Sequence, residues 1–157
     1  MTSLPAPSVL LVTGAYYPEI SAAGVQCRAV AAALTGRVRF GVLTTAVDAS
    51  LPAAQTIDDV LVHRVPVDVR SRWSAPATTL RFVTRMLSIQ PGFDLIHVHG
   101  FSRKNIPAML LPRLARKPVL LTLHTAGQDE PDAIFRRGWL AGMAFRSAAL
   151  VGRTKPV

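Results

Sequence analysis

The chain has 157 residues, half of them hydrophobic and 17% charged, so it is long enough and apolar enough to fold around the core of one domain. Pro and Gly are scattered singly, which excludes collagen-like and low-complexity chains. A net charge of +9 favours anionic partners such as nucleotides, nucleic acid or acidic lipid. No cluster interleaves aromatic residues with arginines, so we expect no nucleic acid partner.

Five short runs of leucine and β-branched residues predict strands that are buried on both faces, as in a parallel sheet. They are Ser8–Thr13, Val38–Thr44, Val60–Val65, Asp94–Val98 and Val119–Leu123. The segment Val47–Asp59 is predicted to be a loop, and Ala148–Gly152 could begin a sixth strand.

Helical segments alternate with these strands. They are Ala22–Leu34, Ala75–Ile89, Lys104–Ala115 and Pro131 to about Ser147. In the second of them, Leu80, Val83 and Leu87 are predicted to form the apolar stripe. This alternation indicates right-handed crossovers and predicts an α/β fold with a Rossmann-like, doubly wound, mostly parallel sheet.

The expected cellular compartment follows from the single cysteine and from the lack of long apolar runs. Cys27 is the only cysteine, so no intramolecular disulfide can form and a reducing compartment fits best. The apolar stretch Val9–Val12 is too short for a signal-peptide core, and no run approaches the roughly 18 apolar residues of a membrane span. We therefore expect a cytoplasmic protein, at most peripheral at the inner membrane surface.

The loop after the first strand, residues 13–24, carries small residues just before an Ala-rich helix. In a parallel sheet, ligands lie at the carboxyl ends of the strands, and unpaired N–H groups at a helix start favour anions. Gly14 and Gly24 are ten positions apart, so this is not a dinucleotide-binding fingerprint, and no phosphate-binding P-loop follows. The alternative is a plain turn with Ser21 as the helix N-cap.

Histidines occur at the ends of the fourth and fifth predicted strands. His97 and His99 point to the same side of their strand, which places His99 at the crevice, and His124 follows the neighbouring strand. A lone histidine in such a place is more often structural, but two in register favour a functional site. We discount zinc, because neither strand end has an acidic ligand or metalloenzyme spacing. The acidic cluster at residues 129–132 suits the first turn of a helix, and no Gly-x-Ser-x-Gly hydrolase elbow occurs.

Three segments taken together, Leu10–Gln26, Phe93–Gly100 and Pro118–Thr125, resemble the N-terminal domain of family 4-like retaining glycosyltransferases of the GT-B fold. The resemblance implies transfer of a sugar from a nucleotide-sugar donor to a glycan or lipid acceptor, with no metal or other cofactor expected. It also implies two Rossmann-like domains facing each other across a cleft, the N-terminal one on the acceptor side.

The resemblance also implies roles for individual residues. Ala23 and Gly24 match the paired small residues where the backbone approaches donor phosphate and sugar, with Ala23 in place of the commoner Gly. His99 matches a pocket-lining histidine, and His124 matches the histidine near the reacting sugar, which we assign as catalytic. Thr125, next to it, is assigned to substrate binding.

Residues 1–157 are expected to be this single N-terminal domain, with the C-terminal donor-binding domain absent. The chain would then act with a separately encoded C-terminal domain, or be an inactive truncated product. The alternative is a stand-alone Rossmann-like protein that binds nucleotide or carbohydrate without catalysis. A nicotinamide-dependent oxidoreductase is weakly supported, because the glycine fingerprint is missing.

Arg81 and Arg85 lie one helical turn apart with Trp73 just ahead, which suggests contact with an anionic membrane surface. A solvated charged stripe is the competing interpretation.

Overall fold

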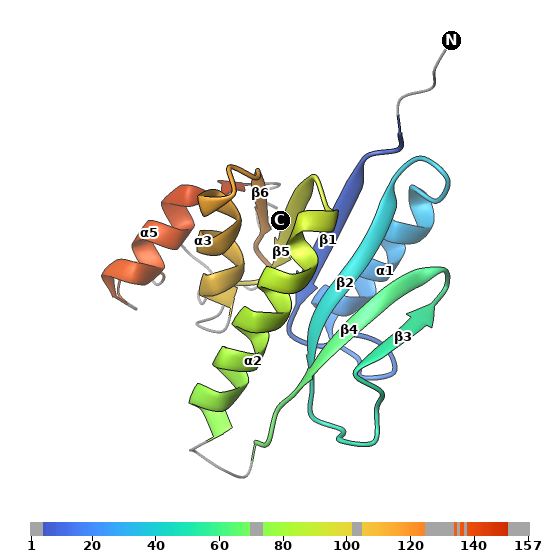
Figure 1. Cartoon of the computed structure of the whole chain (residues 1–157), viewed down its shortest axis with the longest axis horizontal. Coiled ribbons are helices and arrows are strands. Elements are labelled where there is room, and N and C mark those ends of the chain that lie inside the picture. Colours follow the sequence, from blue (N-terminus) through green and yellow to red (C-terminus); the bar gives the residue numbers. More distant parts are fainter. Residues whose placement is uncertain are drawn as a thin grey trace, which may run out of the picture.

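The computed structural model describes residues 5–69, 74–101, 105–124, 134, 136 and 138–150. Within these residues seven strands form one sheet in the order β3-β4-β2-β1-β5-β6-β7 (Figure 1). The strands are β1 (Ser8–Thr13), β2 (Arg39–Ala46), β3 (Ala54–Ile57), β4 (Val60–Pro66), β5 (Leu95–His99), β6 (Val119–Thr122) and β7 (Ala149–Leu150). Only β3 pairs antiparallel in this described part, which confirms the predicted Rossmann-like, mostly parallel sheet.

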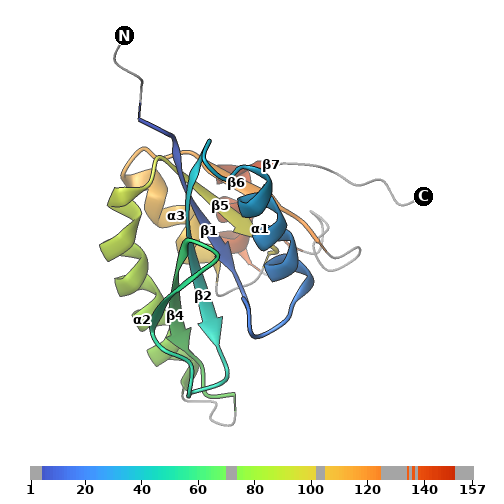
Figure 2. The same ribbon diagram turned by 90° about the vertical axis from the view of Figure 1, so that its right-hand side faces the viewer.

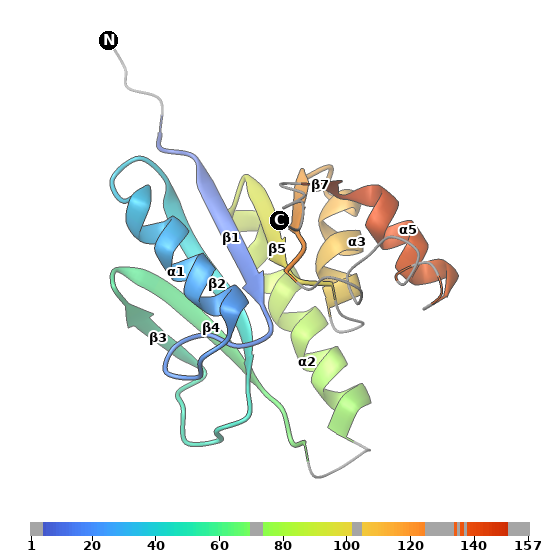
Figure 3. The same cartoon turned by 180° about the vertical axis from the view of Figure 1, so that it is seen from behind.

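Helices lie on both faces of the sheet. They are α1 (Ala22–Ala33), α2 (Ser74–Ile89), α3 (Ile106–Leu114) and α5 (Trp139–Ser147), with a short 3₁₀ turn at Gln90–Gly92. Helix α1 covers one face, whereas α2 and α3 cover the other (Figure 2). Seen from behind, α1 stands in front of β1 and β2 (Figure 3). The four helices match the predicted helical segments in order, although the predicted start at Pro131 lies outside the described residues.

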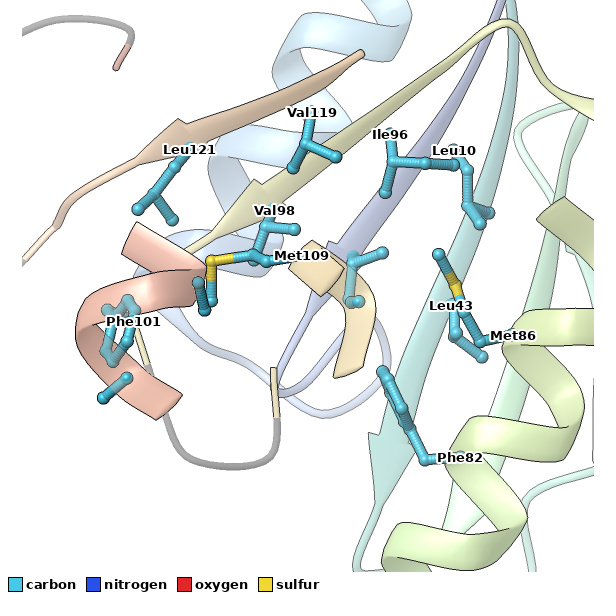
Figure 4. Close-up of a cluster of buried hydrophobic side chains, with 14 of the residues drawn as sticks. Leu10, Leu43, Phe82, Met86, Ile96, Val98, Phe101, Met109, Val119 and Leu121 are labelled. Atoms are coloured by element: carbon cyan, nitrogen blue, oxygen red, sulfur yellow. The ribbon is translucent and has the colours of Figure 1, made fainter. Parts of the chain in front are cut away.

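Neighbouring residues of the central strands enter two separate cores, because successive strand side chains point to opposite faces. Leu10 packs with Phe82 and Met86 of α2 and with Met109 of α3 in the larger core (Figure 4). Leu11 instead joins the smaller core beneath α1, which also contains Tyr16, Cys27, Ala31, Val42 and Val62. Burial on both faces explains why the strand sequences are continuously apolar.

The predicted loop Val47–Asp59 is wrong in part, because it contains strand β3. This strand pairs with β4 through a tight turn in which Asp58 and Asp59 have φ of +48° and +63°. Aspartate tolerates the left-handed conformation that such hairpin turns require. Ala54, Gln55 and Thr56 are exposed, so this edge strand carries no apolar run that could have revealed it.

The predicted apolar stripe of α2 is also wrong. Leu80 and Leu87 are 65% and 46% exposed, whereas Phe82 and Met86 are almost fully buried. The helix has apolar residues around more than one side, and the sheet selects the face with the larger aromatic and thioether side chains. Leu80 and Leu87 are consequently exposed on α2, and Leu80 precedes Arg81 in the sequence.

The C-terminal elements are described as far as Leu150. Helix α5 begins after Gly138, which has φ of +117°, a value that favours glycine. Strand β7 confirms the sixth strand predicted from Ala148, and the residues beyond Leu150 lie outside the described part. None of the described helices is both long and apolar enough to cross a membrane.

Candidate active site

Three of the four histidines, His97, His99 and His124, lie on or just after β5 and β6, which are neighbours in the sheet. His99 pairs in register with Thr122, the last residue of β6, and His124 follows two positions later. The ring centroids of His97 and His99 are 4.1 Å apart, and His99 Nδ1 lies 3.3 Å from His124 Nε2. The structure therefore confirms that adjacent strands bring His99 and His124 together.

Two of these imidazoles are neutral at neutral pH. Burial, together with the neighbouring histidines, lowers the pKa of His97 to about 4 and that of His99 to about 3. His97 Nε2 lies 2.8 Å from the hydroxyl oxygen of Thr122. His99 Nε2 is buried and has no hydrogen-bond partner among the described residues. His97 and His99 therefore bring uncharged hydrogen-bonding groups to this end of the sheet, and such groups suit hydroxyl-rich ligands better than free anions.

The start of α1 is closed by a serine cap. Gly24 donates its backbone N–H to Ser21 Oγ at 2.9 Å, which confirms the N-cap interpretation of this loop. Gly24 also has a packing role, since a Cβ there would stand 2.5 Å from the backbone oxygen of Ala15. The N–H groups of Ala22 and Ala23, in the first turn, have no intrahelical acceptor. They remain the groups of this helix start that can meet an anion.

The helix start and the histidine row lie on the same face of the sheet. His97 is the register partner of Leu11, and Leu11 packs in the core beneath α1. The histidines lie at the carboxyl end of β5 and β6, and the start of α1 follows the carboxyl end of β1. In Figure 3 the start of α1 lies next to the tip of the β1 arrow. They can thus line one cleft. Thr125, the remaining predicted site residue, lies outside the described residues.

Side chains fix the loop between β1 and α1 to the adjoining strand. Thr45 donates its hydroxyl to the carbonyl of Gly14 at 2.5 Å. A carboxylate oxygen of Glu19 accepts the backbone N–H groups of Val47 and Asp48 at 2.7 and 2.8 Å. The loop is therefore held in place before any ligand binds, which reduces the entropy lost on binding.

Arg64 makes a third attachment that the sequence analysis missed. It is 3% exposed and donates to the carbonyl of Tyr17 at 2.9 Å. It also donates to the carbonyl of Pro52 and to the side-chain oxygen of Gln55, both at 3.3 Å. A charged residue inside an apolar strand run was the available signal, because a buried arginine needs several acceptors.

A hollow of about 390 Å³ lies between β4 and α2, away from His97, His99 and His124. Its lining consists of Arg64, Val65, Pro66, Arg81, Thr84, Arg85 and Ser88. Across the described part of the chain, neither Arg81 nor Arg85 has an ion-pair partner, although they stand one turn apart. As for metals, no group of three or more His, Cys, Asp or Glu among the described residues could hold an ion.

Comparison with protein families shows which family the chain belongs to. The profile of the glycosyl transferase 4-like domain matches residues 21–154, which is most of the chain. The chain belongs to this family. No curated protein matches this chain in sequence.

Solved structures share its fold. A putative UDP-N-acetylglucosamine 2-epimerase from Listeria monocytogenes superimposes with a TM-score of 0.60 and 14% identity, over 92% of this chain and 38% of its own. Sucrose-phosphate synthase from Thermosynechococcus elongatus gives 0.55 and 16%, over 77% and 34%. A trehalose-6-phosphate protein from E. coli, bound with UDP-2-fluoro glucose, gives 0.55 and 11%, over 89% and 37%. The chain thus spans little more than a third of the length of these neighbours.

Proposed function

We propose that this domain forms the acceptor side of a retaining glycosyltransferase, which transfers a sugar from a nucleotide-sugar to a glycan or lipid acceptor. Family membership supports the reaction class. The observation that carries the proposal is the contact of His99 with His124 at the carboxyl end of the sheet, on the face covered by α1. Imidazole nitrogens there can hydrogen-bond sugar oxygens.

Each site residue has a role in this proposal. His124 contacts the reacting sugar, and His99 lines the pocket behind it. Ala23, in the first turn of α1, would let a phosphate or sugar approach the backbone, while Gly24 lets this turn pack closely against the Ala15 carbonyl. Thr125 would bind substrate beside His124. The donor is a substrate, and the proposal includes no metal or other cofactor.

Sugar transfer also needs groups on the opposite side of the cleft. The leaving phosphate must be stabilised while the acceptor hydroxyl is held in line, and such groups lie on opposite sides of a two-domain cleft. The 157 residues cover 34% to 38% of the neighbours' lengths. We therefore propose that a nucleotide-binding domain, on the same or on a separate polypeptide, completes the enzyme, and that residues 1–157 alone are inactive.

The test is a transfer assay on residues 1–157 with and without that second domain, using UDP-glucose and UDP-N-acetylglucosamine as donors. Release of UDP coupled to a glycosylated acceptor only in the mixture supports the proposal. Transfer by residues 1–157 alone contradicts the division of roles. Tight donor binding by the 157 residues, without transfer in the mixture, favours a stand-alone binding protein. Epimerised donor would place the domain with the epimerase-like neighbours.

A peripheral membrane contact is a second proposal, carried by Arg81 and Arg85, which have no ion-pair partner within the described part, and by the exposed Leu80 and Leu87 of the same helix. Basic side chains that line the hollow beside β4 would contact anionic lipid at the inner membrane surface, with the exposed leucines on another side of the same helix. Trp73 lies outside the described residues. Flotation with anionic and with neutral liposomes tests it, and equal failure to bind both would exclude the contact.

A further inference from the structure

The hollow between β4 and α2 is lined by arginines, hydroxyl residues, a valine and a proline, with no carboxylate among the described residues that form it. Its volume of about 390 Å³ is in the range of pockets that hold small ligands. Arg81 and Arg85 line it from one turn of α2 to the next, and Arg85 is half-buried. The helix side of the hollow therefore carries two positive charges, one of them partly shielded from water.

These two charges are not neutralised within the described part of the protein. The side chains of Arg81 and Arg85 make no hydrogen bond or ion pair with any residue that the structure describes. The sequence of α2 contains no Asp or Glu. Like charges four residues apart on a helix repel each other and destabilise it. An anion between the two guanidinium groups would remove this repulsion.

The strand side of the hollow supplies no counter-charge either. Val65 packs with α2 in the larger core, so the side chain of its neighbour Arg64 points to the opposite face, where it donates to the Tyr17 carbonyl. His63 lies on the same face as Val65, and its pKa is lowered by burial and by the charge of Arg85. An imidazole held neutral beside a guanidinium leaves the charge of Arg85 unbalanced.

The hydroxyl groups of the lining are already used within the helix. Thr84 donates to the carbonyl of Arg81 at 2.9 Å, and Ser88 donates to the carbonyl of Arg85 at 2.8 Å. Binding of an anion must therefore depend on the guanidinium groups. Their forked N–H donors match the several oxygens of a phosphate group, and two adjacent cations suit its double negative charge.

We propose that this hollow is a binding site for a phosphate group, which Arg81 and Arg85 hold with their forked N–H donors. The phosphate belongs to a small soluble molecule or to a lipid headgroup, and the recognition chemistry is the same in both. The site is separate from the histidines of β5 and β6, so the inference does not rest on sugar transfer. It goes beyond a membrane contact, because it predicts saturable binding without any membrane.

Titration of the ¹⁵N-labelled chain with inorganic phosphate and with glycerol 3-phosphate, at constant ionic strength, tests the site in solution. We expect saturable amide shifts confined to residues 61–66 and 81–88. Arg81→Gln and Arg85→Gln should each weaken binding about ten-fold, because each removes hydrogen bonds to a charged group. Absence of saturable shifts in both segments with both ligands overturns the proposal.

Variants separate a specific site from general attraction by positive charge. The double variant Arg81→Lys, Arg85→Lys keeps the charge but loses the forked donors, so it should bind phosphate several-fold more weakly. The double control Arg37→Gln, Arg113→Gln removes the same charge from exposed positions and should keep the affinity within about two-fold, because salt screens distant charges. An equal loss in this control and in Arg81→Gln, Arg85→Gln overturns the proposal.

Flotation identifies the source of the phosphate. Phosphatidylcholine vesicles with and without phosphatidic acid are compared, in the presence and absence of glycerol 3-phosphate. Vesicle binding that glycerol 3-phosphate displaces supports a lipid headgroup in the hollow, whereas solution binding without vesicle binding supports a soluble phosphate ester. Vesicle binding that glycerol 3-phosphate leaves unchanged, without solution binding, overturns this site and retains only the membrane contact. None of these measurements uses sugar transfer, so the failure of transfer would contradict only the proposed function.

Discussion

His97 and His99 make the stability of the fold depend on pH. In the unfolded chain their imidazoles take up protons below about pH 6.5, whereas in the folded chain the pKa values are about 4 and about 3. The unfolded state thus binds more protons between pH 6.5 and these values. The free energy of unfolding is therefore largest above that window and falls as the pH falls through it.

We predict a loss on the order of 3 kcal/mol for each of these two histidines between pH 7 and pH 4, since each unit of pKa corresponds to about 1.4 kcal/mol. Urea unfolding at several pH values measures it. The double variant His97→Gln, His99→Asn should show a much flatter dependence. The same slope in the variant and in the wild type would show that other groups control acid stability.

Gly24 tests how closely α1 packs against the loop before it. Gly24→Ala places a methyl group against the Ala15 carbonyl, and a backbone atom cannot move aside cheaply. We expect a loss of about 1–2 kcal/mol in the free energy of unfolding, despite the better helix propensity of alanine. Gly14→Ala is the matched control, because nothing lies within 4 Å of a Cβ there. Equal stability of the two variants would contradict the close packing.

At the scale of elements, Arg64 joins the edge hairpin to the loop before α1. Arg64→Met leaves the carbonyls of Tyr17 and Pro52 without their donor. We expect a loss of about 2–3 kcal/mol, because hydrogen bonds to charged groups contribute strongly when buried. Amide hydrogen exchange should accelerate in residues 14–20 and 54–57 and stay unchanged in α3.

Arg37→Met, at an exposed position, is the control and should change little. Uniform acceleration throughout the sheet in Arg64→Met would mean that the residue supports the whole fold instead of this junction.

The sequence predicts elements well where burial imposes a pattern. The central strands are apolar on both faces, so their runs stand out in the sequence. Strand β3 escaped because its residues are exposed and its pairing uses backbone groups. The face of α2 could not be chosen, since Leu80 and Phe82 are equally apolar by sequence and only packing distinguishes them.

The candidate site, like the fold, is predictable from the sequence only in part. Strand alternation places His99 and His124 at one edge, but their 3.3 Å contact depends on the register of β5 with β6, which no local pattern gives. The capping role of Ser21 follows from local chemistry. The burial of Arg64 depends on three distant acceptors and emerges only in the folded chain.

At the scale of the whole molecule, the buried histidines and the fixed loop lie at the carboxyl end of the parallel strands, and we propose that this end forms one side of a cleft. The chain belongs to the glycosyl transferase 4-like family and spans 34% to 38% of the length of the three neighbours. The net charge of +9 would favour the approach of a nucleotide-sugar or an anionic surface, with the effect weakening as salt increases.

The central claim is that His124 acts in transfer, and the rate of the completed two-domain enzyme tests it most directly. His124→Ala should reduce kcat/KM about 100-fold or more, as expected for loss of a positioned donor, while the free energy of unfolding falls by only about 1 kcal/mol. His63→Ala, a half-buried histidine on β4, should leave the rate within a few-fold. Similar rates in the wild type and His124→Ala, with both variants folded, would contradict the account.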